Sequence, residues 1–250
     1  MFGYDLSLIA IMTAALITGG IVKGVVAIGL PIVTIAILLN FMPPTTVLAI
    51  VVLPIVITNL WQSARAGNLM EPVRRFWAMT ACFVIFLFVG ARLVVELDTR
   101  VLFGVLGTCV AIFSATSLLR PRVHPLQPRT EKWAGPLAGT LGGLLGGVST
   151  IWGPPMMMYL MMLKLDKDTW VRTIGMIWFC GAVPLAIAYW QNGVLNPDNF
   201  WLSAYACVPS MIGIRIGETL RDRINQETFR KALLVILFII GLNLIRRAVF

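Results

Sequence analysis

The sequence predicts an all-α polytopic membrane protein made of two inverted repeats, each with three transmembrane helices and one broken, re-entrant helical hairpin. Three observations predict this fold class. The chain contains long uncharged apolar runs, its two halves share an order of glycines and prolines, and its basic residues are unevenly distributed between the runs.

The apolar runs set the number of membrane segments. Of the 250 residues, 58% are hydrophobic and only 12% are charged, whereas soluble domains carry about 25% charged residues. A run of roughly 20 apolar residues matches a hydrocarbon core about 30 Å thick. Eight apolar regions are expected, at 6–39, 44–61, 76–95, 101–119, 133–163, 170–190, 200–216 and 229–245.

Several function classes are disfavoured by composition. The net charge of +9 comes from short basic clusters between apolar runs, which membrane topology requires, so nucleic-acid binding is not expected. The single histidine, His124, lies outside the apolar runs, and no phosphate-binding loop is present. We therefore expect no enzyme activity, metal or cofactor. The four cysteines are interpreted as small buried apolar residues: Cys82, Cys109, Cys180 and Cys207.

Residues 120–132, RPRVHPLQPRTEK, are rich in proline and basic side chains and are predicted to be an exposed cytoplasmic linker. The linker separates a first membrane repeat, 1–119, from a second, 133–250. The N-terminus, MFGYDLSL, has no Lys or Arg before its first apolar run, so no cleavable signal peptide is expected.

An internal repeat is predicted from matches at an offset of 123 positions. Gly19, Gly20 and Gly24 then fall on Gly142, Gly143 and Gly147, and Pro31 falls on Pro154. The same offset places Gly90 and Arg92 on Gly213 and Arg215. Secondary transporters are commonly built from such repeats.

The first region of each half is too long for one span and too short for two. Each contains a glycine-rich stretch that ends in proline, GGIVKGVVAIGLP in the first and GGLLGGVSTIWGPP in the second. Proline removes a backbone donor and glycine weakens a helix. We expect each region to break near its middle into two half-length helices that enter and leave on the same side.

Charge counting favours these hairpins. Eight single crossings would put ten basic residues on one side and nine on the other, without the bias that membrane proteins show. Two re-entrant hairpins would put fifteen inside and four outside. The halves are then inverted, the basic loops are cytoplasmic and both termini are periplasmic.

Lys23 is the strongest candidate for a ligand-binding residue. It lies 17 residues into the first apolar region, beside the expected break. A cation at membrane depth costs at least ~2.5–3.5 kcal/mol, so it normally faces a cavity or a partner. Contact with an anion is the preferred interpretation, and snorkelling to an interface or gating are the alternatives. A buried acidic partner is difficult to arrange, because all eleven Asp and Glu residues lie in loops or near segment ends.

The breaks supply further candidate donors. A helix that begins at a break directs free N–H groups and its positive dipole end toward an anion, and prolines fit its first turn. The predicted substrate-binding residues are Lys23, Gly20, Gly24, Gly29, Gly147, Ser149, Thr150, Trp152 and Gly153. Close helix packing is an equally good explanation for Gly20, Gly24, Gly143 and Gly147.

Other polar residues near segment ends are candidates for the mouths of a pathway. Interfacial solvation is the default explanation for the amides, and helix-end anchoring is at least as good for the arginines. The candidate pore-mouth residues are Asn59, Gln62, Arg92, Gln191 and Arg215.

The two glycine-rich stretches and the paired Gly-x-Arg motifs at 90–92 and 213–215 resemble those of the sulfite exporter TauE/SafE family, over essentially the whole chain. This resemblance implies a bacterial inner-membrane transporter of sulfite, organosulfonate or related anions, with export implied by the family alone. One departure is Thr150, where the family often has glycine in a Gly-Gly-x-Ser-Gly pattern. The cysteine path of a thiosulfate-handling branch is not carried over.

The main hypothesis is therefore an anion transporter that binds its substrate near the membrane midplane between the two breaks. Its expected partners are a small sulfur-containing anion and the lipid bilayer, with a homo-oligomer left open. A non-transporting membrane scaffold or subunit is the alternative, in which the breaks serve packing and Lys23 snorkels.

Overall fold

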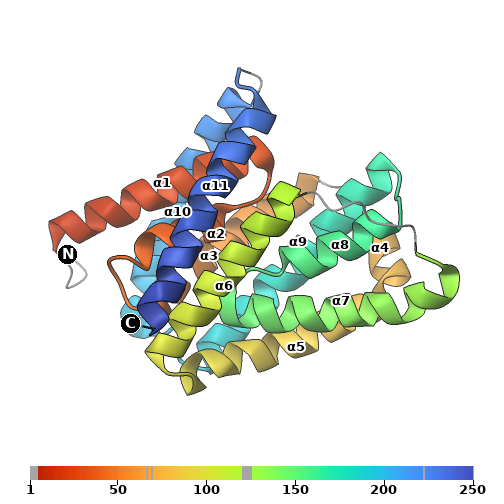
Figure 1. The fold of residues 1–250 in the computed structure, drawn as a ribbon, viewed down its shortest axis with the longest axis horizontal. Coiled ribbons are helices and arrows are strands. Elements are labelled where there is room, and N and C mark those ends of the chain that lie inside the picture. Colours follow the sequence, from red (N-terminus) through yellow and green to blue (C-terminus); the bar gives the residue numbers. More distant parts are fainter. Residues whose placement is uncertain (1–4, 66, 69, 120–125, 222, 250) are drawn as a thin grey trace. The chain divides into compact units, whose positions relative to one another are not determined.

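The computed structural model describes residues 5–65, 67–68, 70–119, 126–221 and 223–249, and these are mostly helical, without strands (Figure 1). Residues 120–125, the first six of the thirteen in the predicted linker, lie outside the described residues. The helices are α1 Leu6–Val26, α2 Leu30–Leu38, α3 Pro44–Arg65, α4 Met70–Arg75, α5 Trp77–Glu96, α6 Thr99–Leu119, α7 Pro128–Ser149, α8 Gly153–Met162, α9 Lys167–Gln191, α10 Pro197–Leu220 and α11 Gln226–Val249.

Seven helices of the described chain are long and apolar enough to cross a membrane, and they confirm a multi-pass membrane protein. They are α1, α3, α5, α6, α9, α10 and α11. Each coincides with a predicted apolar region. Helix α7 is equally long but begins with the charged residues Arg129, Glu131 and Lys132, so it starts earlier than the apolar run that predicted it.

The helices form two compact units, and each unit draws on both halves of the sequence. Unit 1 comprises Met1–Ile55, Leu97–Leu119 and Gly193–Phe250, and unit 2 comprises Val56–Glu96 and Arg120–Asn192. Helix α3 passes from the first to the second just after its internal proline, Pro54. The units are therefore not the two sequence halves.

Unit 1 is held together by two helix pairs and a hairpin. Helix α1 packs along α10, α6 packs along α11, and α2 packs on α1 (Figure 1). The hydroxyl groups of Thr13 and Tyr205 lie 3.0 Å apart and join α1 to α10. Arg221 Nε donates to the carbonyl oxygen of Val25 at 3.1 Å, which satisfies one of the open carbonyl groups at the end of α1.

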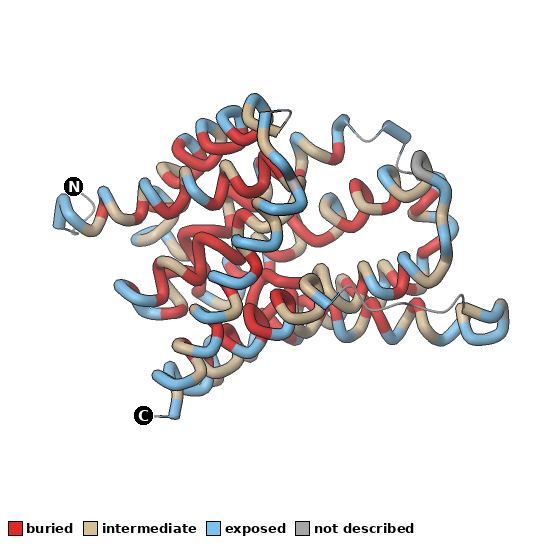
Figure 2. Tube along the Cα trace, turned by 45° about the horizontal axis from the view of Figure 1, so that its top comes forward, coloured by how far each residue is buried: buried red, intermediate tan, exposed pale blue. Residues whose placement is uncertain are grey.

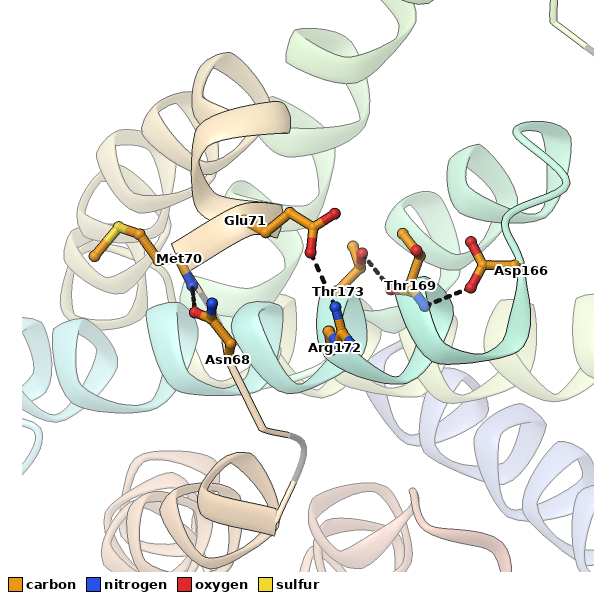
Figure 3. A network of polar contacts seen from close by, with 7 residues as sticks. All are labelled: Asn68, Met70, Glu71, Asp166, Thr169, Arg172 and Thr173. Atoms are coloured by element: carbon orange, nitrogen blue, oxygen red, sulfur yellow. Dashed lines mark hydrogen bonds and ion pairs between the residues drawn. The ribbon is translucent and has the colours of Figure 1, made fainter.

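Unit 2 shares part of this arrangement, a long helix pair with a short helix packed on it. Helix α7 packs along α5, α8 packs on α7, and α9 packs on α5 (Figure 1). A polar network joins the short α4 to α9, where Arg172 Nη1 lies 2.9 Å from Glu71 Oε2 (Figure 3). In the same network Asp166 accepts a hydrogen bond from the backbone N–H of Thr169 at 3.0 Å, at the start of α9 (Figure 3).

Buried residues follow one side of most helices, and exposed residues follow the other (Figure 2). Exposed positions in the middle of the apolar helices carry large hydrophobic side chains, such as Ile85, Ile112 and Ile239. Side chains of this kind suit a lipid-facing surface, because the hydrocarbon core of a bilayer contains no water.

Adjacent glycines on α1 and α7 permit two different close contacts. A Cβ atom added to Gly24 would lie 2.8 Å from the Cα of Gly217 on α10. One added to Gly147 would lie 2.8 Å from the carbonyl carbon of Gly90 on α5. Gly19, one position before Gly20, faces α2 instead, because a Cβ added to it would lie 2.8 Å from the carbonyl oxygen of Leu30. Gly142, one position before Gly143, faces α8.

These contacts correct one part of the predicted repeat. Gly24 and Gly147 are 123 positions apart, as expected, but their partners Gly217 and Gly90 are 127 positions apart. Arg92 therefore corresponds to Thr219 and not to Arg215. The two offsets, 123 and 127, differ by four residues, which is close to one helical turn. Both offsets therefore place a glycine on the packing face, and the sequence pattern alone cannot choose between them.

Helices α2 and α8 each fold back along the helix before them, which forms two hairpins. On α1 and α2, Gly19 faces Leu30, and the hydroxyl of the later Thr34 donates to the carbonyl oxygen of the earlier Ala15 at 3.4 Å. On α7 and α8, a Cβ on Gly142 would lie 2.8 Å from Met156 Cγ, and one on the earlier Gly135 would lie 3.1 Å from the hydroxyl of the later Tyr159.

The expected half-length helices are wrong. The first hairpin pairs a helix of 21 residues with one of 9, and the second pairs 22 with 10. The glycines at 19, 20 and 24 do not end α1, because they lie where neighbouring backbones approach closely. The break comes only at 27–29, directly before the helix that contains Pro31.

Candidate functional site

The two breaks share one backbone conformation. The residue directly after α1 is Ala27 (φ 65°) and the residue directly after α7 is Thr150 (φ 61°), and both are left-handed although neither is glycine. The N–H of Ala27 donates to the carbonyl oxygen of Lys23, and the N–H of Thr150 to that of Gly146, both at 2.8 Å. A positive φ is unfavourable for residues with a Cβ, above all for a β-branched one.

The short helices begin as the sequence predicts, with prolines in their first turns: Pro31 in α2, and Pro154 and Pro155 in α8. The residue before α2, Gly29, has a φ of 109°, which side chains rarely permit. The residue before α8, Trp152, has ordinary helical angles, and Gly153 begins the helix. Neither N-terminus receives a hydrogen bond from the side chain of its capping residue.

Lys23 lies in the last turn of α1 and is buried, with 8% of its surface exposed. A cation is favoured at this end of a helix, where unpaired carbonyl groups carry negative partial charge. A lysine side chain is therefore buried beside the first break, and its contact with an anion stays a prediction.

The two breaks differ by an exchange of large and small residues. Gly146 stands where α1 has Lys23, and Trp152 stands where the first break has Gly29, each at the offset of 123. A Cβ added to Gly146 would lie 3.0 Å from both Cβ and Cε3 of Trp152. In unit 2 the side chain of Trp152 therefore lies against Gly146, the position that corresponds to Lys23 in unit 1.

The end of α7 is fixed by hydrogen bonds that the sequence did not predict. Ser149 Oγ donates to the carbonyl oxygen of Leu145 at 2.6 Å and accepts from the N–H of Ile151 at 3.2 Å. The hydroxyl of the buried Tyr189, on α9, donates to the carbonyl oxygen of Gly147 at 2.9 Å. Ser149 thus has a local structural role, and its contact with substrate stays a prediction.

Thr150 and Trp152 are different, because the polar atoms of their side chains have no partner among the described residues. The Thr150 hydroxyl and the Trp152 indole N–H are both buried and unpaired. Trp152 packs against Phe83 and Trp178, with ring centroids 5.8 Å apart in both pairs. Trp178 was not predicted, although its place near the middle of an apolar run, away from an interfacial belt, is a signal that could have identified it.

Gly20, Gly24 and Gly147 all face neighbouring backbone. The carbonyl oxygens of Ser210, Ile214 and Leu87, respectively, would be the nearest atoms to an added Cβ. The packing interpretation therefore holds for all three, as it does for Gly143, which faces the carbonyl oxygen of Phe83. Contact of their backbones with an anion stays a prediction.

The candidate pore-mouth amides are placed differently from one another. Asn59 is buried, with 4% of its surface exposed, so interfacial solvation does not explain it. Its carbonyl oxygen accepts a hydrogen bond from Ser63 Oγ at 2.7 Å. Gln62 is half-buried and Gln191 is exposed.

Arg92 and Arg215 are both exposed and paired within their own helices. Arg92 Nε lies 2.7 Å from Glu96 Oε1, and Arg215 Nη1 lies 3.5 Å from Glu218 Oε2. Exposed pairs of this kind contribute little to stability. The expectation that the two arginines occupy matching places is wrong, because the packing register differs by one turn, as described above.

Three comparisons bear on identity. The family model described as "Sulfite exporter TauE/SafE" matches residues 11–244. No curated protein and no solved structure matches the chain. Because the match spans nearly the whole chain, including both breaks and all or most of each of the seven apolar helices, the protein belongs to the sulfite exporter TauE/SafE family.

Proposed function

We propose that this protein transports a small sulfur oxyanion, sulfite or an organosulfonate, out of the bacterial cytoplasm, and that Lys23 binds this anion at the first break. The observation that carries the proposal is the burial of Lys23 in the last turn before α2. A buried cation in a membrane protein is costly and marks an ion pathway more often than an ordinary structural position.

Family membership supports the transport class. The family is one of sulfite exporters, and the chain has seven helices suited to a membrane. Anions of this class carry oxygen acceptors and negative charge, which suit a lysine ammonium group and the N-terminus of a helix.

The equivalence of the two breaks supports a role for the start of α2. At Gly146 the Cα–Cβ direction points toward residue 152, which precedes α8. Because the two breaks share the conformation at the end of the long helix, we infer that the side chain of Lys23 extends toward the start of α2, where Gly29 has no side chain of its own. The lysine and the positive end of α2 then act on the same anion within unit 1.

The membrane arrangement is part of the proposal. Helices α1 and α2 form one re-entrant hairpin and α7 and α8 form the other, in repeats of opposite orientation. Support comes from the matching contacts of α1 with α10 and of α7 with α5. The bias of basic residues supports an inner-membrane orientation with cytoplasmic basic loops and periplasmic termini.

Anion-dependent thermal stabilisation of the purified protein tests the binding step. Sulfite or methanesulfonate is expected to raise the melting temperature of the wild type, because a ligand of the folded state stabilises it. Lys23→Met, which keeps the side chain long but uncharged, should lose this increase. Lys132→Met is the matched control, since Lys132 is exposed. A wild type that no oxyanion stabilises would favour a scaffold.

A further inference from the structure

Unit 2 contains three buried donors without an acceptor among the described residues. They are the hydroxyl of Thr150 and the indole N–H groups of Trp152 and Trp178. Thr150 and Trp152 each have 2% of their surface exposed. An unpaired buried donor is unfavourable, and native proteins keep few of them unless water, an ion or a ligand completes the site.

The residues that carry the three donors are neighbours at the second break. Thr150 and Trp152 belong to the same break, and the ring of Trp152 lies 5.8 Å from that of Trp178, measured between centroids. Trp152 Cζ2, which is bonded to the ring carbon next to Nε1, would lie 3.2 Å from a Cβ added to Gly181. Gly181 is about one turn after Trp178 on α9, so the N–H edge of Trp152 faces the part of α9 that carries Trp178.

The chemistry of this cluster suits an oxygen acceptor. An indole N–H donates and cannot accept, and a threonine hydroxyl can donate. Helix α8 begins at Gly153, directly after Trp152, so its positive dipole end adds to the three donors. No charged side chain is among these groups, and therefore the cluster would bind an anion through neutral donors alone.

We propose that Thr150, Trp152 and Trp178 form an uncharged oxyanion site in unit 2, in which the three side chains donate hydrogen bonds to the oxygen atoms of a sulfite or sulfonate group. The inference rests on the proposed function, because its ligand is the transported anion. It assigns a binding role to Trp178 and gives the second break a chemistry different from that of Lys23.

Kinetics of anion flux in proteoliposomes test this site. The half-saturating concentrations of sulfite and methanesulfonate are measured for the wild type, Thr150→Val and Trp178→benzothienylalanine. The first variant replaces the hydroxyl by a methyl group, and the second replaces the N–H by sulfur in a ring of similar shape. Each loss of a donor to an anion should raise the half-saturating concentration on the order of tenfold. Trp133→Phe is the control, because Trp133 is 80% exposed on α7.

Stability without anion separates binding from structural support. Both variants remove a donor that has no partner, so their melting temperatures in anion-free buffer should equal or exceed that of the wild type. Lower melting temperatures with slower flux would overturn the inference, since the groups would then hold the fold.

Unchanged half-saturating concentrations in both variants would also overturn the inference, and would mean that water satisfies these donors. The proposed function would survive that result if the wild type transports and Lys23→Met does not. A wild type that neither transports nor is stabilised by any oxyanion would overturn both proposals.

Discussion

The hydroxyl of Tyr189 donates a hydrogen bond of 2.9 Å to the carbonyl oxygen of Gly147. Tyr189 is fully buried on α9, and Gly147 lies in the last turn of α7, where the helix no longer supplies a donor to every carbonyl group. A single side chain thus ties α9 to the end of the helix that precedes the second break.

Tyr189→Phe should lower stability by about 1–3 kcal/mol, because the buried carbonyl group of Gly147 loses its donor. Thermal unfolding of the purified protein in detergent measures this loss as a lower melting temperature. The control is Tyr159→Phe, since Tyr159 is also a buried residue and its hydroxyl makes no hydrogen bond to any residue that the structure describes. Equal melting temperatures for the two variants would contradict the structural role of Tyr189.

Gly147→Ala should disrupt the packing of α7 on α5. Its Cβ would collide with the backbone carbonyl oxygen of Leu87 and lie 2.8 Å from the carbonyl carbon of Gly90, and backbone atoms cannot move as a side-chain tip can. Overpacking of this kind costs about 1–3 kcal/mol. Gly104→Ala is the control, because its Cβ would meet only the side chain of Ala248, at 3.3 Å. Similar yields and melting temperatures for both variants would argue against the close contact.

Ala27→Gly should stabilise the protein. Ala27 has a φ of 65°, and the left-handed conformation costs a residue with a Cβ about 1–2 kcal/mol. Glycine avoids this cost, and the gain is partly offset by the greater freedom of glycine in the unfolded chain. The expected result is a melting temperature above that of the wild type. A decrease would show that the methyl group of Ala27 contributes packing that outweighs its backbone strain.

The proposed orientation predicts which positions a membrane-impermeant thiol reagent reaches in intact cells. In a background with the four native cysteines replaced by alanine, Arg246→Cys should react from outside, and Lys132→Cys only after the cells are permeabilised. Both positions are exposed. Labelling of Lys132→Cys in intact cells would reverse the orientation that the basic residues predict.

Much of the fold could be predicted because membrane spans have a strong compositional signal. The seven apolar helices coincide with predicted runs, and the prolines at 31, 154 and 155 mark the starts of the short helices. The point at which α1 ends could not be predicted in the same way. Glycines at 19, 20 and 24 suggest an earlier break, but helix packing stabilises them inside α1, and for Gly20 and Gly24 that packing depends on residues of α10 nearly 200 positions later in the chain.

The candidate site was predictable only where a residue is unusual for its surroundings. Lys23 stands out as a charge in an apolar run, and it is indeed buried beside the break. Trp178, Tyr189 and Phe83 are ordinary residues for a membrane span, and only the fold brings them to the second break. Ser149 and Thr150 look alike in sequence, yet one hydroxyl is used in local hydrogen bonds and the other has no partner among the described residues.

Sulfite and methanesulfonate flux across proteoliposomes that contain the wild type or Lys23→Met tests the central claim most directly. Wild-type flux with an initial rate on the order of tenfold lower in Lys23→Met, at an unchanged melting temperature, is the predicted result, since the variant loses a charged contact with the anion. The absence of wild-type flux of either anion in either direction, with a proton gradient imposed, would contradict the account.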